Sequence, residues 1–292
     1  MHPLLADLLQ VLRLQQIEPD RFRGESRDPG HHRVFGGQVL GQALAAACAT
    51  VENRDVHSLH AYFLRAGDPD HPIVYEVDRS RDGTSFTSRR VVAIQHDAQI
   101  FHMSASFQVK QEGIDRQGAM PDVPHPDSLP DMATVIAELK IKAPDRPLPF
   151  RDLQRPFEFR PAAMPDPAAD VPKEPHMKLW FRAVDRLPDD EILHRSLLAY
   201  ASDYYLLGTA GMDMRLTLGQ RDVQTASIDH AMWFHRPARV DEWLLYVLDS
   251  STACGSRGLA RGAIFSQDGR LIASTAQEGL VRRRAAPPPT GL

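Results

Sequence analysis

The chain contains 292 residues, enough for one large domain or two of ordinary size, and its 42% hydrophobic and 25% charged residues are typical of a folded globular protein. The formal net charge is -4 and the sequence pI is about 6.3. These values exclude the overall basic field that gathers nucleic acid or anionic lipid around a protein, so we expect no nucleic-acid partner.

Several common targeting and catalytic signals are missing from the sequence. No stretch approaches the roughly 18 uncharged apolar residues of a membrane span. Asp7 interrupts an amino terminus that has no basic leader, so we expect a cytoplasmic protein. Cys48 and Cys254 lack the spacing of a disulfide framework or a zinc site. No HExxH, GxGxxG, Walker-type or GxSxG motif occurs, and we therefore expect chemistry by dispersed residues, with no metal or organic cofactor.

The first half of the chain is predicted to hold one buried helix and several strands. Gly36–Ala47 is apolar on nearly all sides and rich in alanine and glycine, which predicts a helix wrapped by a sheet. Tyr62–Arg65 ends a predicted strand. The apolar run Val91–Ile94 leads through a turn at His96–Gln99 into a further strand. This pattern indicates antiparallel hairpins beside the helix.

A proline-rich segment separates the two halves. Residues 111–154 contain seven prolines, which predicts a linker, and Met132–Leu139 is predicted to form a short helix within it. A second stretch rich in proline, Pro161–Pro175, is predicted to be a long loop near the start of the second half.

The second half repeats the order of elements found in the first. Ser196–Tyr205 is predicted to form the corresponding helix, and it carries a carboxylate, Asp203, at the end of its apolar run. Trp233–Arg236 ends a strand, and the turn Gln267–Arg270 contains an Asp-Gly pair typical of tight hairpins. The basic and proline-rich end of the chain is interpreted as a solvated tail.

The two halves align without a gap when Arg65 is placed on Arg236, 171 positions later. The alignment then pairs Tyr75 with Tyr246, Arg90 with Arg261, Ile94 with Phe265, Asp97 with Asp268, and Ser104 with Thr275. This repetition predicts an α+β protein with two tandem units, each an antiparallel sheet wrapped around a central helix. We predict an N-terminal domain at 1–110, a linker at 111–154, a C-terminal domain at 155–285 and a tail at 286–292.

Matched segments from Leu12 to about Arg283 resemble the type II acyl-CoA thioesterases, a family of double-hotdog enzymes. These segments are Phe22–Gly24, Val34–Val39 and His60–Arg65 in the first half, and Tyr200–Asp203, Ile228–Pro237 and Ser274–Gly279 in the second. The resemblance implies a tandem hotdog fold and hydrolysis of acyl-CoA to free fatty acid and CoA. It also implies assembly into a homodimer or homotetramer.

The same resemblance implies three catalytic residues, Asp203, Ser227 and Gln277. Members of the family carry an aspartate on the second helix, a hydroxyl residue before the Ile-Asp-His run and a glutamine on the last strand. Serine at 227 replaces the usual threonine. A carboxylate can act as general base toward a water that a hydroxyl and an amide orient. Backbone N–H groups at Gly36–Gln38 are predicted to stabilise the oxyanion.

The first half is predicted to lack a second catalytic site. The alignment pairs Gln277 with Ser106, and it pairs Ser227 with His57 if one residue is gapped. Asp203 corresponds to an apolar residue near Leu44 or Ala45, so the first half lacks the carboxylate. We interpret His57, His60, His230 and His235 as structural residues.

Two alternative functions stay open at this point. Asp68 and His71 are similar to the Asp/His pair of hotdog hydratases that act on enoyl-CoA, although here they are predicted to lie in a turn. A non-catalytic hotdog protein that binds acyl-CoA is the second alternative, and it would be expected to lack at least one of the three polar groups.

Overall fold

The computed structural model describes residues 1–28, 30, 32–142, 155–164, 175–212 and 223–283. The first half contains α1 (Pro3–Leu12), β1 (Gln15–Glu18), β2 (Arg21–Gly24), α2 (Gly36–Cys48), β3 (Asp55–Phe63), β4 (Ile73–Asp82), β5 (Phe86–Gln95) and β6 (Ala98–Gln108). Between the halves lie the 3₁₀ turn η1 (Pro126–Ser128) and α3 (Met132–Lys142). The second half contains β7 (Phe157–Ala163), β8 (His176–Ala183), α4 (Glu191–Ser202), α5 (Leu206–Ala210), β9 (Val223–Ser227), β10 (Asp229–Phe234), β11 (Leu244–Cys254), β12 (Arg257–Ser266) and β13 (Leu271–Arg283).

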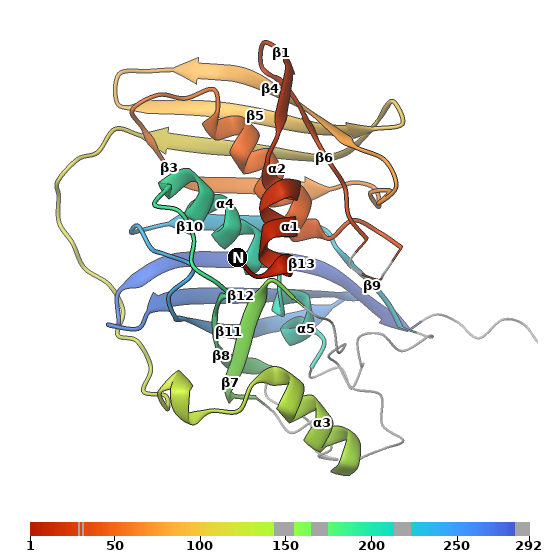
Figure 1. Cartoon of the computed structure of the whole chain (residues 1–292), viewed down its shortest axis with the longest axis vertical. Helices are drawn as coiled ribbons and strands as arrows, with labels where there is room; N and C mark the ends of the chain where they lie inside the picture. The colour runs from red at the N-terminus through yellow and green to blue at the C-terminus, as the bar shows by residue number, and fades with distance from the viewer. Residues whose placement is uncertain (29, 31, 143–154, 165–174, 213–222, 284–292) are drawn as a thin grey trace, which may run out of the picture.

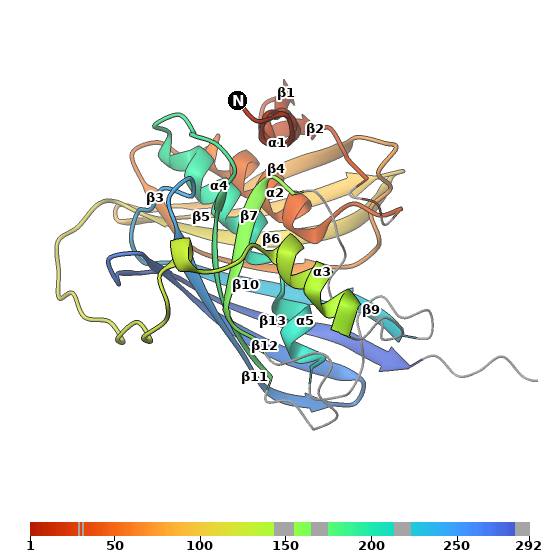
Figure 2. The same ribbon diagram turned by 60° about the horizontal axis from the view of Figure 1, so that its bottom comes forward.

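The described strands form a single antiparallel sheet of 13 strands that runs through both halves. Its order is β1-β2-β4-β5-β6-β3-β10-β13-β12-β11-β8-β7, with β9 also paired to β13. The halves join where β3 pairs with β10, for example Ala61 opposite His230. Figure 1 shows α2 and α4 on one face of this sheet, and Figure 2 shows the same arrangement from another side. The predicted α+β architecture, one helix packed on antiparallel strands in each half, is confirmed. None of the helices within the described ranges has the length and apolar character needed to cross a bilayer.

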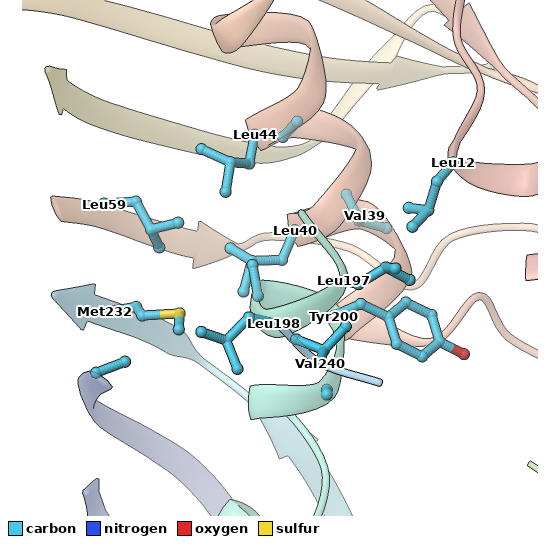
Figure 3. Packing of buried hydrophobic residues seen from close by; sticks show 14 of the residues in the cluster. Leu12, Val39, Leu40, Leu44, Leu59, Leu197, Leu198, Tyr200, Met232 and Val240 are labelled. Atoms are coloured by element: carbon cyan, nitrogen blue, oxygen red, sulfur yellow. The ribbon is translucent and has the colours of Figure 1, made fainter. Parts of the chain in front are cut away.

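The helices α2 and α4 pack side by side in the centre of the molecule. Leucines of both helices, among them Leu40 and Leu198, meet in the shared core with residues from β3 and β10 (Figure 3). Gly37 permits the close approach, because a Cβ there would lie 2.3 Å from the Tyr200 carbonyl oxygen. One turn later a Cβ at Gly41 would lie 3.0 Å from the carbonyl oxygen of Ser196. The helices therefore run antiparallel, and the start of α2 meets the end of α4.

The segment predicted as a linker packs against the second half. Trp180 donates from Nε1 to the carbonyl oxygen of Pro124 over 3.0 Å. Met120, Val123 and Leu129 pack on a small cluster of Trp180, Trp243, Leu245 and Phe265. The short helix predicted at Met132–Leu139 is confirmed as part of α3. Residues 143–154 and the predicted tail lie outside the described residues, and the predicted domain limits stay predictions.

The prediction of a long loop at Pro161–Pro175 is wrong at its beginning. Pro161 to Ala163 belong to β7, the last strand in the sheet order. Among the described strands β7 pairs on one side only, so Pro161 can occupy a position whose missing N–H is not needed by a neighbouring strand. Residues 165–174 lie outside the described residues.

The gapless alignment of the halves is wrong beyond the turn that connects β5 to β6 in the first half and β12 to β13 in the second. Tyr75 faces Ala93 and Tyr246 faces Ile264, so the 171-residue spacing holds through β5 and β12. The turn His96–Asp97 places two residues, both with positive φ, between the paired Gln95 and Ala98. In the second half three residues, Gln267–Gly269, separate Ser266 from Arg270, and the Ser266 N–H donates to the Arg270 carbonyl oxygen.

The register of the last strand differs by one residue as a consequence. Arg89 faces Ala105 and Ala260 faces Gln277, so Gln277 corresponds to Ala105 and not to Ser106. A slip of one residue moves a side chain to the other face of a sheet.

Candidate active site

Asp203 lies directly after the last residue of α4, as its C-cap, with a side chain that is only 6% exposed. Its Oδ1 accepts a hydrogen bond from Gln277 Nε2 at 2.7 Å, and its Oδ2 accepts from the backbone N–H of Gly37 at 2.8 Å. Burial raises the pKa of Asp203 above its ordinary value of 3.8, although both hydrogen bonds act in the opposite direction. A carboxylate with a raised pKa is better matched to proton transfer near neutral pH.

Gln277 projects from β13 into the interior and is 1% exposed. Its Nε2 contacts two acceptors, Asp203 Oδ1 and, at 3.1 Å, Nδ1 of His230. The carboxylate can only accept, so the amide nitrogen must face it and the amide oxygen must point elsewhere. That oxygen, Oε1, is buried without a hydrogen-bond partner among the described residues. An unpaired buried acceptor beside a carboxylate is a favourable place for a water molecule.

His230 holds the amide of Gln277 in this orientation. Its ring is fully buried, which lowers its pKa to about 3, so it is neutral. Ser202 Oγ donates to the carbonyl oxygen of Ala199 and lies 2.9 Å from His230 Nε2. Nε2 therefore carries the proton, which leaves Nδ1 to accept from Gln277. The interpretation of His230 as structural missed this contact, because the sequence does not reveal which side chains face Gln277.

The start of α2 is the positive end of a 13-residue helix, and it faces the carboxylate. A Cβ at Gly36 would lie 2.8 Å from Asp203 Oδ2, so a side chain there would displace the acid. The Gly37 N–H, predicted as an oxyanion donor, instead bonds to Asp203. Part of the predicted oxyanion site is thus already occupied by the carboxylate.

Ser227 ends β9 and faces Gly279 of β13. Residues directly opposite each other, and residues two apart on one strand, share a face of a sheet. Ser227 and Gln277 are therefore diagonal neighbours on the same face, with a typical separation of about 7 Å. In the part of the chain that the structure describes, no hydrogen bond joins the Ser227 hydroxyl to Asp203 or Gln277, so direct contacts unite only two of the three predicted residues.

Aromatic side chains surround the end of α4. The ring of Phe35, at the start of α2, stacks on Tyr204 with centroids 4.8 Å apart and meets Tyr200 edge-on at 5.1 Å. Phe157 stacks on Tyr200, with centroids 6.0 Å apart. Tyr204 directly follows Asp203, so these rings add apolar surface next to the residue whose pKa is raised by burial.

The opposite ends of α2 and α4 border an open cavity of about 430 Å³ whose lining includes Cys48, Val56, Phe107 and Glu191. Val56 pairs with Phe107 in the first half in the same way as Ser227 pairs with Gly279 in the second. This cavity in the first half is therefore the equivalent, by the internal repeat, of the candidate site in the second half. The residue corresponding to Ser227 is therefore Val56, and the match to His57 was wrong by one position.

The other candidate histidines lie away from this site. His57 Nε2 is 2.8 Å from Ser106 Oγ, and His235 Nε2 is 2.9 Å from Ser274 Oγ. His60 packs edge-on against Trp233, with ring centroids 5.3 Å apart. Within the described residues none of these three rings bonds to Asp203 or Gln277, in agreement with a structural role.

Comparison with known proteins relates both halves of the chain to one family. A family model described as acyl-CoA thioesterase matches residues 151–280, and one described as acyl-CoA thioesterase N-terminal domain matches residues 25–108. Acyl-CoA thioesterase 2 of Haemophilus influenzae is 41% identical, covering 97% of this chain and 99% of that protein. Human acyl-coenzyme A thioesterase 8 is also 41% identical, covering 93% of this chain and 88% of that protein.

Solved structures give the same relationship. The crystal structure of an acyl-CoA thioesterase II, TesB2, from Mycobacterium marinum superposes with a TM-score of 0.78 at 43% identity, covering 95% of this chain and 99% of that one. A hot dog fold protein from Alicyclobacillus acidocaldarius, at 19% identity, has a TM-score of 0.75 over 96% of this chain and 99% of its own, which supports the fold alone. The chain therefore has the double-hotdog fold and belongs to the type II acyl-CoA thioesterase family.

Proposed function

We propose that this protein, as a thioester hydrolase of its family, cleaves acyl-CoA with one water molecule held by Asp203, Ser227 and Gln277. The water oxygen attacks the thioester carbonyl carbon while the carboxylate of Asp203 takes a proton from it. When the tetrahedral intermediate collapses, the C–S bond breaks, and the fatty acid and CoA thiolate are released. The thiolate then receives a proton, so the carboxylate is regenerated for the next cycle.

The observation that carries this proposal is the amide oxygen of Gln277, which has no hydrogen-bond partner in the described part of the chain and lies beside the buried carboxylate of Asp203. A water between them can donate one hydrogen to Oε1 and the other to Asp203, which directs its lone pairs outward. The Ser227 hydroxyl, on the same face of the sheet, can add a third hydrogen bond to fix the water. Serine keeps the donor and acceptor of threonine but loses its methyl group, so its rotamer is less restricted.

The oxyanion is assigned to the backbone at the start of α2. Since Gly37 N–H bonds to Asp203, the preceding N–H of Gly36 is the donor that this assignment uses. The aromatic rings of Phe35, Tyr200 and Tyr204 offer apolar surface for the acyl chain.

Release of free thiol from a medium-chain acyl-CoA, followed with a thiol reagent, tests the function. Gln277→Ala, which installs the residue found at Ala105 in the first half, is expected to lower kcat about 100-fold, as is typical when a reactant is misplaced. Ser227→Ala is expected to lower it less. The matched control is Gln42→Ala: it removes a buried amide that donates to Val11 and Glu25 carbonyls, and it should retain turnover. Equal losses in Gln277→Ala and Gln42→Ala would contradict the proposed role of Gln277.

The same assay separates the alternatives. Thiol release with no change in the absorbance of an enoyl-CoA substrate excludes the hydratase, whose proposed pair, Asp68 and His71, lies in the exposed connection between β3 and β4. Absence of any turnover, with acyl-CoA still bound, would leave the non-catalytic alternative.

Assembly and location are further proposals. Tyr62 and Trp233 are 49% and 36% exposed and alternate along β3 and β10 with buried residues, so both lie on the sheet face away from the helices. Aromatic side chains on an open sheet face favour association with a second copy, in line with a homodimer or homotetramer. Sizing by light scattering tests the assembly, and cell fractionation tests the cytoplasmic location predicted from the sequence.

A further inference from the structure

Three potential metal ligands meet on the surface, where the connection between β3 and β4 lies against the turn between β5 and β6. Asp68 Oδ2 is 2.8 Å from His71 Nδ1 and 2.9 Å from His96 Nε2. One ligand atom from each of the three residues lies within 4.8 Å of the others. The two imidazole rings meet edge-on, with centroids 4.5 Å apart. The three ligand atoms are therefore close enough together to bind one ion at the surface.

A buried amide holds the two loops at this spacing. Gln95 is 4% exposed, and its Nε2 donates to the carbonyl oxygens of Asp68 and His71, each at 2.7 Å. Its Oε1 accepts from the backbone N–H of Asp68, also at 2.7 Å. Because Gln95 directly precedes His96, one residue fixes the backbone of all three ligands. Outer contacts of this kind orient metal ligands before the ion arrives.

The local backbone adds to this preorganisation. His96 and Asp97 have φ values of 51° and 56°, so the two-residue turn holds His96 in the left-handed region. Asp68 Oδ1 accepts from the backbone N–H of Asp70, which orients the carboxylate and leaves Oδ2 for the imidazoles.

We propose that Asp68, His71 and His96 form a surface binding site for a divalent transition metal ion such as Zn²⁺. Two imidazole nitrogens and one carboxylate oxygen are ligands that zinc accepts, and water can complete the coordination. The site joins two loops of the first half and includes none of the residues assigned to hydrolysis, so its role is to stabilise the fold. Sequence spacing did not indicate it, because His96 lies in the turn between β5 and β6, whereas Asp68 and His71 lie in the connection between β3 and β4.

The test is calorimetric titration of the full chain with Zn²⁺ after treatment with a chelator. One zinc per chain is expected, together with a higher thermal midpoint and unchanged thiol release. His96→Asn keeps a residue that tolerates positive φ and should weaken binding at least tenfold, a loss typical of disturbed metal sites. His71→Gln should do the same, and it provides a second reading if His96→Asn fails to fold.

His32→Asn is the matched control. His32 also has a positive φ, 55°, and lies beside an aspartate, with Nδ1 3.6 Å from Asp28 Oδ2. Its replacement should leave zinc affinity unchanged. Absence of zinc binding to the wild-type chain, or wild-type affinity in folded His96→Asn and His71→Gln, would overturn the proposal. Loss of binding in His32→Asn alone would also overturn it, because the ion would then bind elsewhere.

Discussion

Replacement of Asp203 by asparagine changes the proposed base with almost no change in shape. One amide oxygen can still accept from Gly37, but the new NH₂ group faces Gln277 Nε2, another donor. Rotation of the Gln277 amide by half a turn would present Oε1 to this NH₂ group. His230 could then move its proton to Nδ1 and donate to the same oxygen, while Nε2 accepts from Ser202. We therefore expect Asp203→Asn to fold.

Catalysis should fall because the asparagine side chain cannot accept a proton and the rotated amide no longer offers Oε1 to water. Loss of a general base costs about 10² to 10⁴ in rate, or roughly 3 to 5.5 kcal/mol of transition-state stabilisation. Thiol release at saturating acyl-CoA measures kcat directly. The fall in kcat with decreasing pH, assigned to protonation of a group with a pKa above 3.8, should disappear in the variant.

Asp229→Asn is the control for this experiment. Asp229 is a partly buried carboxyl group whose pKa is also raised by burial, and it accepts from the backbone N–H of Glu278 at 2.7 Å. We expect its variant to change kcat by less than about tenfold. A folded Asp203→Asn enzyme with kcat within a factor of ten of wild type would refute the assignment of the base.

The raised pKa of Asp203 also predicts how stability changes with pH. The folded chain holds this proton more tightly than the unfolded chain, whose carboxyl group titrates near 3.8. The stabilising contribution is therefore complete below pH about 4 and is lost as pH rises through the folded pKa. The unfolding free energy of Asp203→Asn, relative to wild type, should increase between pH about 4 and 7 in denaturant titrations. A pH-independent difference would argue against the raised pKa.

Two further substitutions test how the site is held together. Gly37→Ala places a Cβ 2.3 Å from the Tyr200 carbonyl oxygen, so we expect a loss of about 2 kcal/mol or more in unfolding free energy, measured by denaturant titration; unchanged stability would contradict the close helix contact. His230→Leu removes the acceptor that orients Gln277, so we expect kcat to fall about tenfold with KM and the low-pH limb of the profile retained. A wild-type kcat in His230→Leu would show that the amide needs no such support.

Elements with strong local patterns were predictable from the sequence. The alanine-rich run at Gly36–Ala47 can bury all its sides only inside a sheet, and it forms α2 as expected. The turn at His96–Gln99 was recognised from the two apolar runs that flank it, and β5 and β6 pair across it. Asp203 stood out because a carboxylate ends the apolar run that begins at Ser196, an arrangement that is costly unless the acid has partners.

Contacts between distant segments were not predictable in the same way. The Gly37 N–H meets a carboxylate 166 positions later, and nothing local to either residue indicates this bond. Gln277, His230 and Ser202 likewise belong to three different elements. Their alignment depends on the tertiary packing of α4 against the sheet, which a pattern of polar and apolar residues does not specify.

The longer hairpin turn in the second half explains why the gapless alignment of the two halves was wrong beyond that turn. Sequence identity at Asp97 and Asp268 concealed the extra length, yet beyond the turn the register moves every side chain of β13 by one position relative to β6. Gln277 consequently corresponds to Ala105. His230, on the neighbouring strand β10, corresponds to Leu59 on β3. The first half thus offers apolar side chains where the second offers an amide and an imidazole. A water molecule in the first half would meet neither an amide to bind it nor an imidazole to orient that amide. The asymmetry of the duplicated fold therefore restricts the proposed chemistry to one site per chain.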